Sequence, residues 1–190
     1  IACGVGKYSD STGATAESTC TDCTAGKYGP YTAATYYTYS WQHTRTYCID
    51  CGPGKWSDTT GASSSATCTD CAVGRHSWQS GVAEEETCTP CPAGRIAPST
   101  GTDSCARCAR GRYQELIEQT SCDICEAGKY NPTLGSVSRF NCTSCPAGRY
   151  VGTTGNDELS DCINCEPGKY MLYNIVGQTN DNNCLDCPAG

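Results

Sequence analysis

The chain has 190 residues, of which 19 are cysteine, and it carries a formal net charge of −7 at pH 7. Leu, Ile, Val and Phe together make up about a tenth of the residues, which is too little for the shared apolar core of an ordinary globular domain. The acidic balance leaves no basic patch for a nucleic-acid backbone, and no apolar run approaches the ~18 residues of a membrane-spanning helix. We therefore expect a disulfide scaffold, with no nucleic-acid partner and no membrane span in this segment.

A short phrase recurs along the chain at intervals of roughly 20 residues, which is the period of a repeat array. The phrase consists of two cysteines separated by two residues, a glycine three positions after the second cysteine, a basic residue and usually an aromatic residue. Residues 142–150 form a complete copy, CTSCPAGRY. The glycine occurs at Gly6, Gly26, Gly54, Gly74, Gly94, Gly111, Gly128, Gly148, Gly168 and Gly190. The basic residue after it is Lys7, Lys27, Lys55, Arg75, Arg95, Arg112, Lys129, Arg149 or Lys169.

Each repeat is taken to run from the second cysteine of one phrase to the first cysteine of the next. We expect one continuous tandem array over residues 1–190, with approximate repeats 3–20, 23–48, 51–68, 71–88, 91–105, 108–122, 125–142, 145–162 and 165–184, and an incomplete one from 187. Cys3 occupies the second-cysteine position, and the chain stops at Gly190, ahead of the basic and aromatic residues. We therefore interpret the chain as a fragment of a longer one.

Six of the repeats carry a second glycine at a matching position: Gly13, Gly61, Gly81, Gly101, Gly135 and Gly155. Glycine adopts a positive φ at little cost, and turn-forming residues precede several of these positions. We predict a hairpin in each repeat, with a short arm at the aromatic residue, a turn at the second glycine and a return arm that ends in cysteine. The expected fold class is small and disulfide-rich, mostly irregular with short β-hairpins, in an elongated array of ~20-residue single-disulfide repeats.

Three kinds of cysteine chemistry fit this spacing, and the first is a disulfide across each repeat. Small repeats need a covalent link in place of an apolar core, and a bridge closing a ~15-residue loop contributes about 3 kcal/mol in the chain-entropy model. The expected pairs are Cys3–Cys20, Cys23–Cys48, Cys51–Cys68, Cys71–Cys88, Cys91–Cys105, Cys108–Cys122, Cys125–Cys142, Cys145–Cys162 and Cys165–Cys184.

The other two chemistries are a series of zinc ribbons and a thioredoxin-like redox site. The cysteine pairs form an even series that does not group into fours, and no βαβ pattern surrounds any of them. Disulfides are therefore favoured, and their connectivity stays a hypothesis at this point. We expect no metal, no cofactor and no catalytic residues, because His43 and His76 are isolated from acids and nucleophiles.

At this phrase the chain resembles two related module types. Segments 91–94 (CPAG) and 145–150 (CPAGRY) are similar to the cysteine-rich repeat of the ephrin-receptor-like kind. The C-x-x-G-x-Y phrase with its closing cysteine is similar to the single-disulfide module of tumour-necrosis-factor-receptor ectodomains. The resemblance covers essentially the whole chain and implies modules stacked into rods, an aromatic residue packed on its own bridge, and the same cysteine pairing. The chain lacks the two-bridge modules of such receptors, which favours a uniform stalk or fibre.

The longest repeat contains the candidate contact surface. Tyr37, Tyr39 and Trp41 alternate with polar residues, which suits a strand with one aromatic face. Clustered exposed aromatic residues usually mark an interaction surface. The interface is therefore predicted at Tyr36, Tyr37, Tyr39, Trp41 and Tyr47.

Two further surface features carry hypotheses. The Lys or Arg of each phrase is either a solvated charge or one of a row of cations facing acidic residues of a neighbouring molecule. The candidate acids are Asp22, Asp50, Asp70, Asp186 and the run 84–86. Asn141 begins an N-x-T sequence and is a candidate glycosylation site.

Together these features predict an extracellular or cell-surface protein that is structural and not an enzyme. It would associate with itself into a rod, surface coat or filament, with glycans as further partners. The alternative is an adhesion or receptor ectodomain that binds a protein ligand through the aromatic loop.

Overall fold

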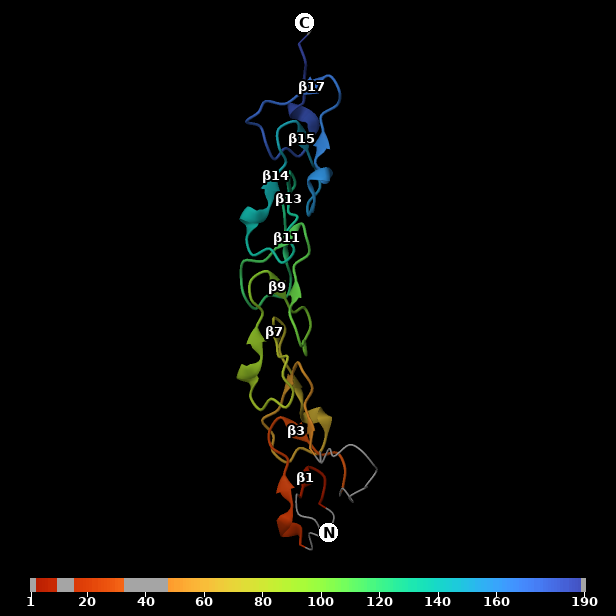
Figure 1. The fold of residues 1–190 in the computed structure, drawn as a ribbon, viewed down its shortest axis with the longest axis vertical. Coiled ribbons are helices and arrows are strands. Elements are labelled where there is room, and N and C mark those ends of the chain that lie inside the picture. The colour runs from red at the N-terminus through yellow and green to blue at the C-terminus, as the bar shows by residue number, and fades with distance from the viewer. Residues whose placement is uncertain (1–2, 10–15, 33–47, 189–190) are drawn as a thin grey trace, which may run out of the picture. The chain divides into compact units, whose positions relative to one another are not determined.

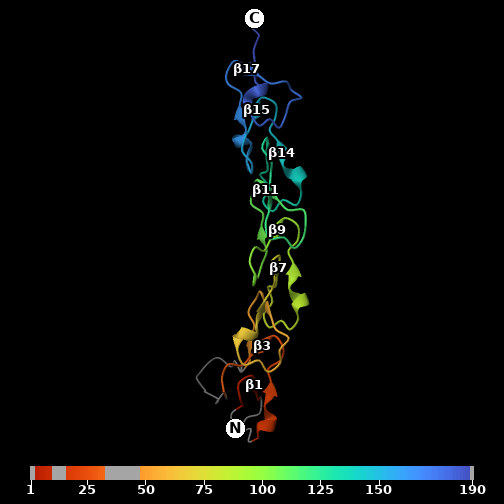
Figure 2. The same cartoon turned by 180° about the vertical axis from the view of Figure 1, so that it is seen from behind.

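The computed structural model describes residues 3–9, 16–32 and 48–188. The chain divides into two compact units, each of which is described by itself. Unit 1 comprises Ile1–Pro90 and Ser99–Ser104, and unit 2 comprises Cys91–Pro98 and Cys105–Gly190. Within each unit, short strands follow one another in chain order (Figure 1), and the view from behind shows the same succession (Figure 2).

Every repeat contributes one antiparallel hairpin of two-residue strands. In unit 1 the pairs are β1 (Lys7–Tyr8) with β2 (Thr21–Asp22), β3 (Lys27–Tyr28) with β4 (Ile49–Asp50), β5 (Lys55–Trp56) with β6 (Thr69–Asp70), and β7 (Arg75–His76) with β8 (Thr89–Pro90). In unit 2 they are β9 (Arg95–Ile96) with β10 (Ala106–Arg107), β11 (Arg112–Tyr113) with β12 (Asp123–Ile124), β13 (Lys129–Tyr130) with β14 (Thr143–Ser144), β15 (Arg149–Tyr150) with β16 (Ile163–Asn164), and β17 (Lys169–Tyr170) with β18 (Leu185–Asp186).

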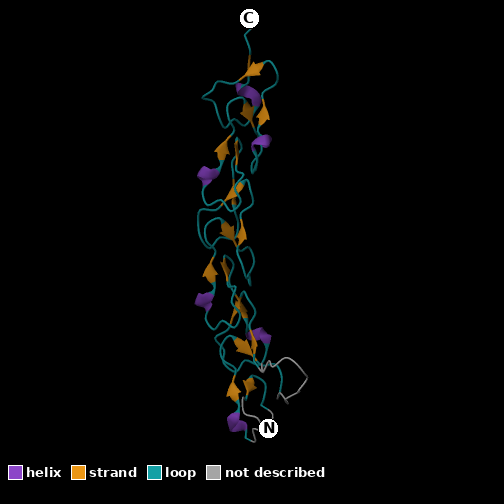
Figure 3. Ribbon diagram, in the orientation of Figure 1, coloured by secondary structure: helices purple, strands orange, loops and turns teal. Residues whose placement is uncertain are grey.

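Among the described residues, short 3-10 helices precede the closing cysteine in six repeats (purple in Figure 3). They are η1 (Glu17–Thr19), η2 (Ser65–Thr67), η3 (Glu85–Thr87), η4 (Arg139–Asn141), η5 (Leu159–Asp161) and η6 (Asp181–Asn183). The two repeats whose cysteines are only 14 residues apart have none of them. Loops make up the rest of the described ranges, which confirms the predicted disulfide-rich fold of short hairpins.

The return strand differs in position from the predicted one. It consists of the two residues between the closing cysteine of one repeat and the first cysteine of the next, as in β6 (Thr69–Asp70). The arm that ends in the closing cysteine does not form the strand. The physical reason is the 3-10 turn, in which the amide of Cys68 donates to the carbonyl of Ser65 at 3.1 Å. This tight turn occupies the end of the arm, so extended pairing begins one residue later.

In two repeats of unit 2, the buried centre is the cystine together with the residue after the aromatic position. Cys91, Ala97 and Cys105 form one such cluster, and Cys145, Val151 and Cys162 form another. The residues at the position of Ala97 and Val151 are buried even where they are polar, as at Ser57, Ser77, Gln114 and Asn131. Tyr130 packs against the Val151 cluster, so this aromatic side chain covers the cystine of the following repeat.

Backbone hydrogen bonds explain why this position is buried. In unit 1, the amide of Gly26 donates to the carbonyl of Ser57 at 2.7 Å, and the amide of Ser57 donates to the carbonyl of Val82 at 3.0 Å. These three residues belong to three successive repeats. Ser57 therefore joins the repeat before it to the repeat after it, and water is excluded from backbone groups that already have partners.

Unit 2 repeats the same ladder with different side chains. The amide of Gly111 donates to the carbonyl of Asn131 at 2.8 Å, and the amide of Asn131 donates to the carbonyl of Asn156 at 3.0 Å. The buried Asn131 amide group is also satisfied, because its Nδ2 donates to the carbonyl of Arg112 at 3.2 Å and its Oδ1 accepts from the Thr133 amide at 3.0 Å.

The second glycine of a repeat also bonds to its neighbour. Its amide donates to the carbonyl of the first cysteine of the preceding repeat, at 2.8 Å from Gly61 to Cys23 and at 2.9 Å from Gly155 to Cys125. Gly177 and Glu118 make the same bond to Cys145 and Cys91, although the spacing of glycines identified neither. Gly177 lies in a repeat with a 19-residue cysteine separation, and Glu118 adopts the glycine-like φ of 61°. Gly13 lies outside the described residues.

Candidate interaction surface

Nine disulfides close the repeats. They join the same cysteines as the pairs proposed above from the sequence, with one bridge across each repeat. They are Cys3–Cys20, Cys23–Cys48, Cys51–Cys68, Cys71–Cys88, Cys91–Cys105, Cys108–Cys122, Cys125–Cys142, Cys145–Cys162 and Cys165–Cys184. The Cα atoms of the Cys125–Cys142 pair lie 5.7 Å apart, as is normal for a bridge. The sulfurs are therefore not thiolates that could hold zinc, apart from the exposed free Cys187.

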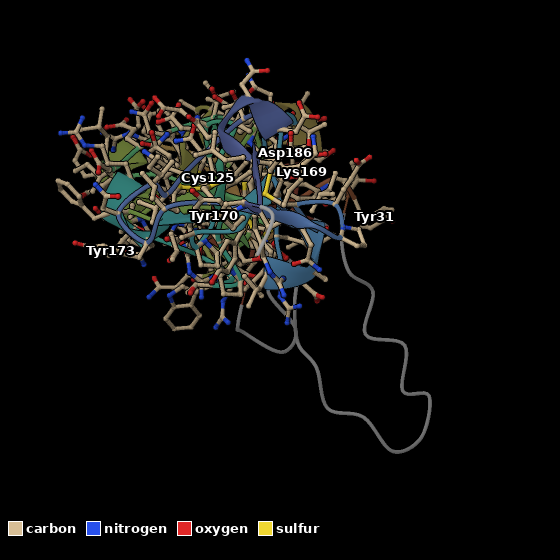
Figure 4. All side chains as sticks on the ribbon, turned by 90° about the horizontal axis from the view of Figure 1, so that it is seen from above. Tyr31, Cys125, Lys169, Tyr170, Tyr173 and Asp186 are labelled. Carbon is tan, nitrogen blue, oxygen red and sulfur yellow. A yellow bond between two sulfur atoms is a disulfide. The ribbon has the colours of Figure 1, made fainter. Side chains whose placement is uncertain are left out.

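The predicted aromatic interface falls outside the part of the chain that the structure describes. This applies to Tyr36, Tyr37, Tyr39, Trp41 and Tyr47. Among the described residues, Tyr31 and Tyr173 carry the most outward-pointing aromatic rings that Figure 4 labels, with 76% and 92% of each residue exposed.

The cations of the lysine-containing repeats are neutralised within their own hairpin. The hairpin register places Lys7 opposite Asp22, and the Nζ to Oδ1 distance is 2.6 Å. Lys27 pairs with Asp50 and Lys55 with Asp70 in the same way. In unit 2, Lys169 and Asp186 lie side by side at 3.9 Å (Figure 4). The hypothesis that these lysines face acidic residues of a neighbouring molecule is therefore wrong for four of the candidate acids. Each of them pairs with a lysine of its own hairpin: Asp22, Asp50, Asp70 and Asp186.

Arginine takes the place of lysine in several repeats where the opposite residue is not an acid, although Lys129 also faces a residue without charge, Ser144, and pairs with Glu126. Arg149 faces Asn164 and Arg112 faces Ile124. The guanidinium turns to a backbone carbonyl near the closing cysteine instead, at 2.9 Å from Arg95 to Cys105 and at 3.3 Å from Arg149 to Leu159. Arginine suits this role because its guanidinium carries a fixed fork of donors, one of which reaches the carbonyl.

A carboxylate connects two repeats of unit 2. Glu115 accepts a hydrogen bond from the Arg139 amide at 2.9 Å and from the Ser138 hydroxyl at 3.2 Å. The bond from the Arg139 amide is the main reason why the pKa of Glu115 lies below its ordinary value. Glu115 thereby caps η4 from the preceding repeat, since first-turn amides lack partners within a short helix.

Exposed apolar side chains adjoin this cap. Leu116 and Ile117 follow Glu115 directly and are 64% and 58% exposed, and Phe140, within η4, is 82% exposed. The guanidinium of Arg139 lies 5.2 Å from the centre of the Phe140 ring, within the range of a cation–π contact. Composition pointed to the Tyr/Trp loop and missed this cluster, although Phe140 is the single phenylalanine of the chain.

The proposed glycosylation residue lies at the end of η4. Asn141 is exposed, and so is Thr143 of the N-x-T sequence, while Cys142 between them is buried in the bridge to Cys125. The side chain of Asn141 is thus on the surface of unit 2.

These features define a series of disulfide-closed repeats that are joined by backbone hydrogen bonds within each unit. Residues 97–142, in the middle of the chain, match the family described as tyrosine-protein kinase ephrin type A/B receptor-like. This match and the regular series of nine disulfides agree with the resemblance to ephrin-receptor-like cysteine-rich repeats that the sequence shows. No curated protein matches the chain.

A repeat of this type is an extracellular receptor-like or structural module, and its many disulfides agree with an extracellular or cell-surface location. In the described part of the chain, no helix has the length and apolar character needed to cross a bilayer.

Proposed function

We propose that this chain is a structural, non-enzymatic protein whose repeats form one continuous rod in a surface coat, stalk or filament. The observation that carries the proposal is the backbone ladder within each unit, in which residues such as Ser57 and Asn131 bond to the repeat before them and to the repeat after them. Arrays held by neighbour contacts extend without limit in one direction, because each added repeat finds the same partner surface.

Two measurements test this proposal. X-ray scattering should yield a radius of gyration well above the roughly 16 Å of a compact globule of this length. Electron microscopy of the native material should show regular polymers. Dispersed single molecules with a compact scattering profile would overturn the structural role.

An adhesion or receptor ectodomain is the second candidate function. The observation that favours it is the exposed cluster of Leu116, Ile117 and Phe140 in the segment that matches the ephrin-receptor-like family. An exposed apolar cluster beside a polar cap is the composition of a protein-binding surface. Replacing these three residues with serine should abolish ligand capture on cells and leave the disulfides intact, whereas unchanged capture would count against this role.

The aromatic loop remains a separate proposed contact in either case. Serine at Tyr37, Tyr39 and Trp41 should weaken assembly without loss of the folded repeats, and unchanged assembly would remove the loop from the interface. Asn141 is proposed to carry an N-linked glycan. A secreted chain from a glycosylating host should then lose one glycan in Asn141→Gln and keep it in the matched control Asn174→Gln, because Asn174 is exposed and begins no N-x-S or N-x-T sequence.

A further inference from the structure

One stretch of the chain is positively charged, although the chain as a whole is acidic. Residues 95–112 contain the four arginines Arg95, Arg107, Arg110 and Arg112 and one acid, Asp103, which is a net charge of +3 in a chain of net charge −7. Arg110 meets Glu158 at 3.6 Å, and Arg112 donates to the carbonyl of Cys122 at 3.4 Å. Arg95 donates to the carbonyl of Cys105 at 2.9 Å, and neither Arg95 nor Arg107 has a carboxylate partner among the described residues.

These two arginines face each other across one hairpin. The register of β9 and β10 places Arg107 directly opposite Arg95, at the positions that hold lysine and aspartate in the repeats of Lys7, Lys27 and Lys55. Like charges in directly opposite positions destabilise a strand pair. A local rule broken in this way is expected where a site serves function.

The side chain of Arg107 has no hydrogen bond or ion pair with any residue that the structure describes. Its stem lies over the Gly135 turn, where a β-carbon on Gly135 would be 3.5 Å from Arg107 Cδ. Leu134, next to this glycine, is 52% exposed. The guanidinium is thus held against the surface of the repeat by its stem, and its fork of donors is available for an oxyanion.

We propose that Arg95 and Arg107 bind the carboxylates of Glu84, Glu85 and Glu86 of a second copy of this chain. The proposal rests on the self-association proposed above and names the contact that sets the stagger between copies. These glutamates form the longest acidic run in the sequence. All three are exposed on and beside η3, and their carboxylates have no partner among the described residues. Asp22, Asp50, Asp70 and Asp186 are paired within their own hairpins.

One substitution tests the proposed contact without destabilising the hairpin. Arg107→Asp places an acid opposite Arg95, as in the lysine repeats, so the hairpin should form at least as well as in the wild type. The matched control is Ile124→Asp with Asn164→Asp, which changes net charge by the same amount at equivalent positions of two other arginine repeats. Sedimentation velocity at low ionic strength should show self-association weakened roughly ten-fold in Arg107→Asp and little changed in the control.

Charge exchange between copies decides whether the contact is intermolecular. Variant A carries Arg95→Glu and Arg107→Glu, and variant B carries Glu84→Arg and Glu86→Arg. Each should associate weakly alone, and an equimolar mixture should recover association, because A presents acids to the reversed cations of B and B presents its native arginines to A.

Four results would overturn the proposal. Wild-type association with no loss in Arg107→Asp, or no recovery in the mixture, removes this contact and leaves self-assembly in place. Arginine-dependent binding of heparin, with self-association unaffected, assigns the site to a sulfated polysaccharide. A wild-type chain that stays monomeric at every concentration refutes the proposed self-assembly itself.

Discussion

Replacement of Gly111 by alanine tests whether the array depends on contacts between repeats that are two steps apart. A β-carbon on Gly111 would lie 2.1 Å from the carbonyl oxygen of Gly155 and 2.6 Å from its carbonyl carbon. Gly111 and Gly155 belong to the repeats 108–122 and 145–162, with one repeat between them. Alanine at this position must therefore push two backbones apart.

The expected cost has two parts. Gly111 has a φ of 73°, and a left-handed conformation costs a non-glycine residue about 1–2 kcal/mol. Overpacking against backbone adds about 1–3 kcal/mol, so the total is about 2–5 kcal/mol. Gly148 is the matched control, because its φ is 83° and a β-carbon there would meet nothing within 4 Å. Gly148→Ala should therefore cost only the first part.

Amide hydrogen exchange on the oxidised chain measures the difference locally, which suits a repeat array better than one global unfolding transition. In Gly111→Ala, the amides of Cys125 and Gly155 should lose protection, since Cys125 donates to the Gly111 carbonyl and Gly155 lies at the clash. The packing part corresponds to a loss beyond the control of roughly five-fold to more than a hundred-fold. Equal losses in the two variants would refute the reasoning, because φ alone would then account for both.

Three further predictions follow from the same contacts. The pKa of Glu115 lies below its ordinary 4.5, so its bonds to η4 stabilise the folded form above that value and are lost as the pH falls through the lowered pKa; the protection factor of the Arg139 amide, which is its intrinsic exchange rate divided by the observed rate at the same pH, should fall there in the wild type and show no such step in Glu115→Gln. Glu118, with a φ of 61°, should accept asparagine and lose about 1–2 kcal/mol with valine, because β-branched residues fit the left-handed region poorly; equal exchange of the Glu118-position amide in both variants would contradict this. Full reduction should add two hydrogens for each of the nine bridges and release the stacked repeats; an unchanged mass would refute the pairing.

The aromatic position shows where sequence reasoning reached its limit. The repeated phrase predicts a fixed position for the aromatic residue. The resemblance implies that its ring packs on the disulfide of its own repeat. In the structure, Tyr130 packs on the cluster of the next repeat, and the residue after the aromatic is the buried one. That position is Ser57, Ala97, Asn131 or Val151, so no shared side-chain type reveals it. Its burial comes from backbone bonds to both neighbours.

The charges show the same limit. Counting over the whole chain indicates an acidic protein with scattered cations, and it conceals both the lysine–aspartate pairs and the facing arginines. Those relations depend on which residues face each other in a hairpin. In the pair of β9 and β10 this register places Arg107 opposite Arg95.

The amino-acid sequence by itself determined the period of the array, the cysteines available to close each repeat and the small hairpins, because these features arise within about 20 residues and depend on cysteine spacing and local turn residues. The tertiary structure alone decided which amide meets which carbonyl in the next repeat, why a glycine such as Gly111 lacks room for a side chain, and which charges are left without partners. Those contacts join backbone groups of different repeats, and backbone groups are the same for every amino acid, so they leave little trace in the order of side chains.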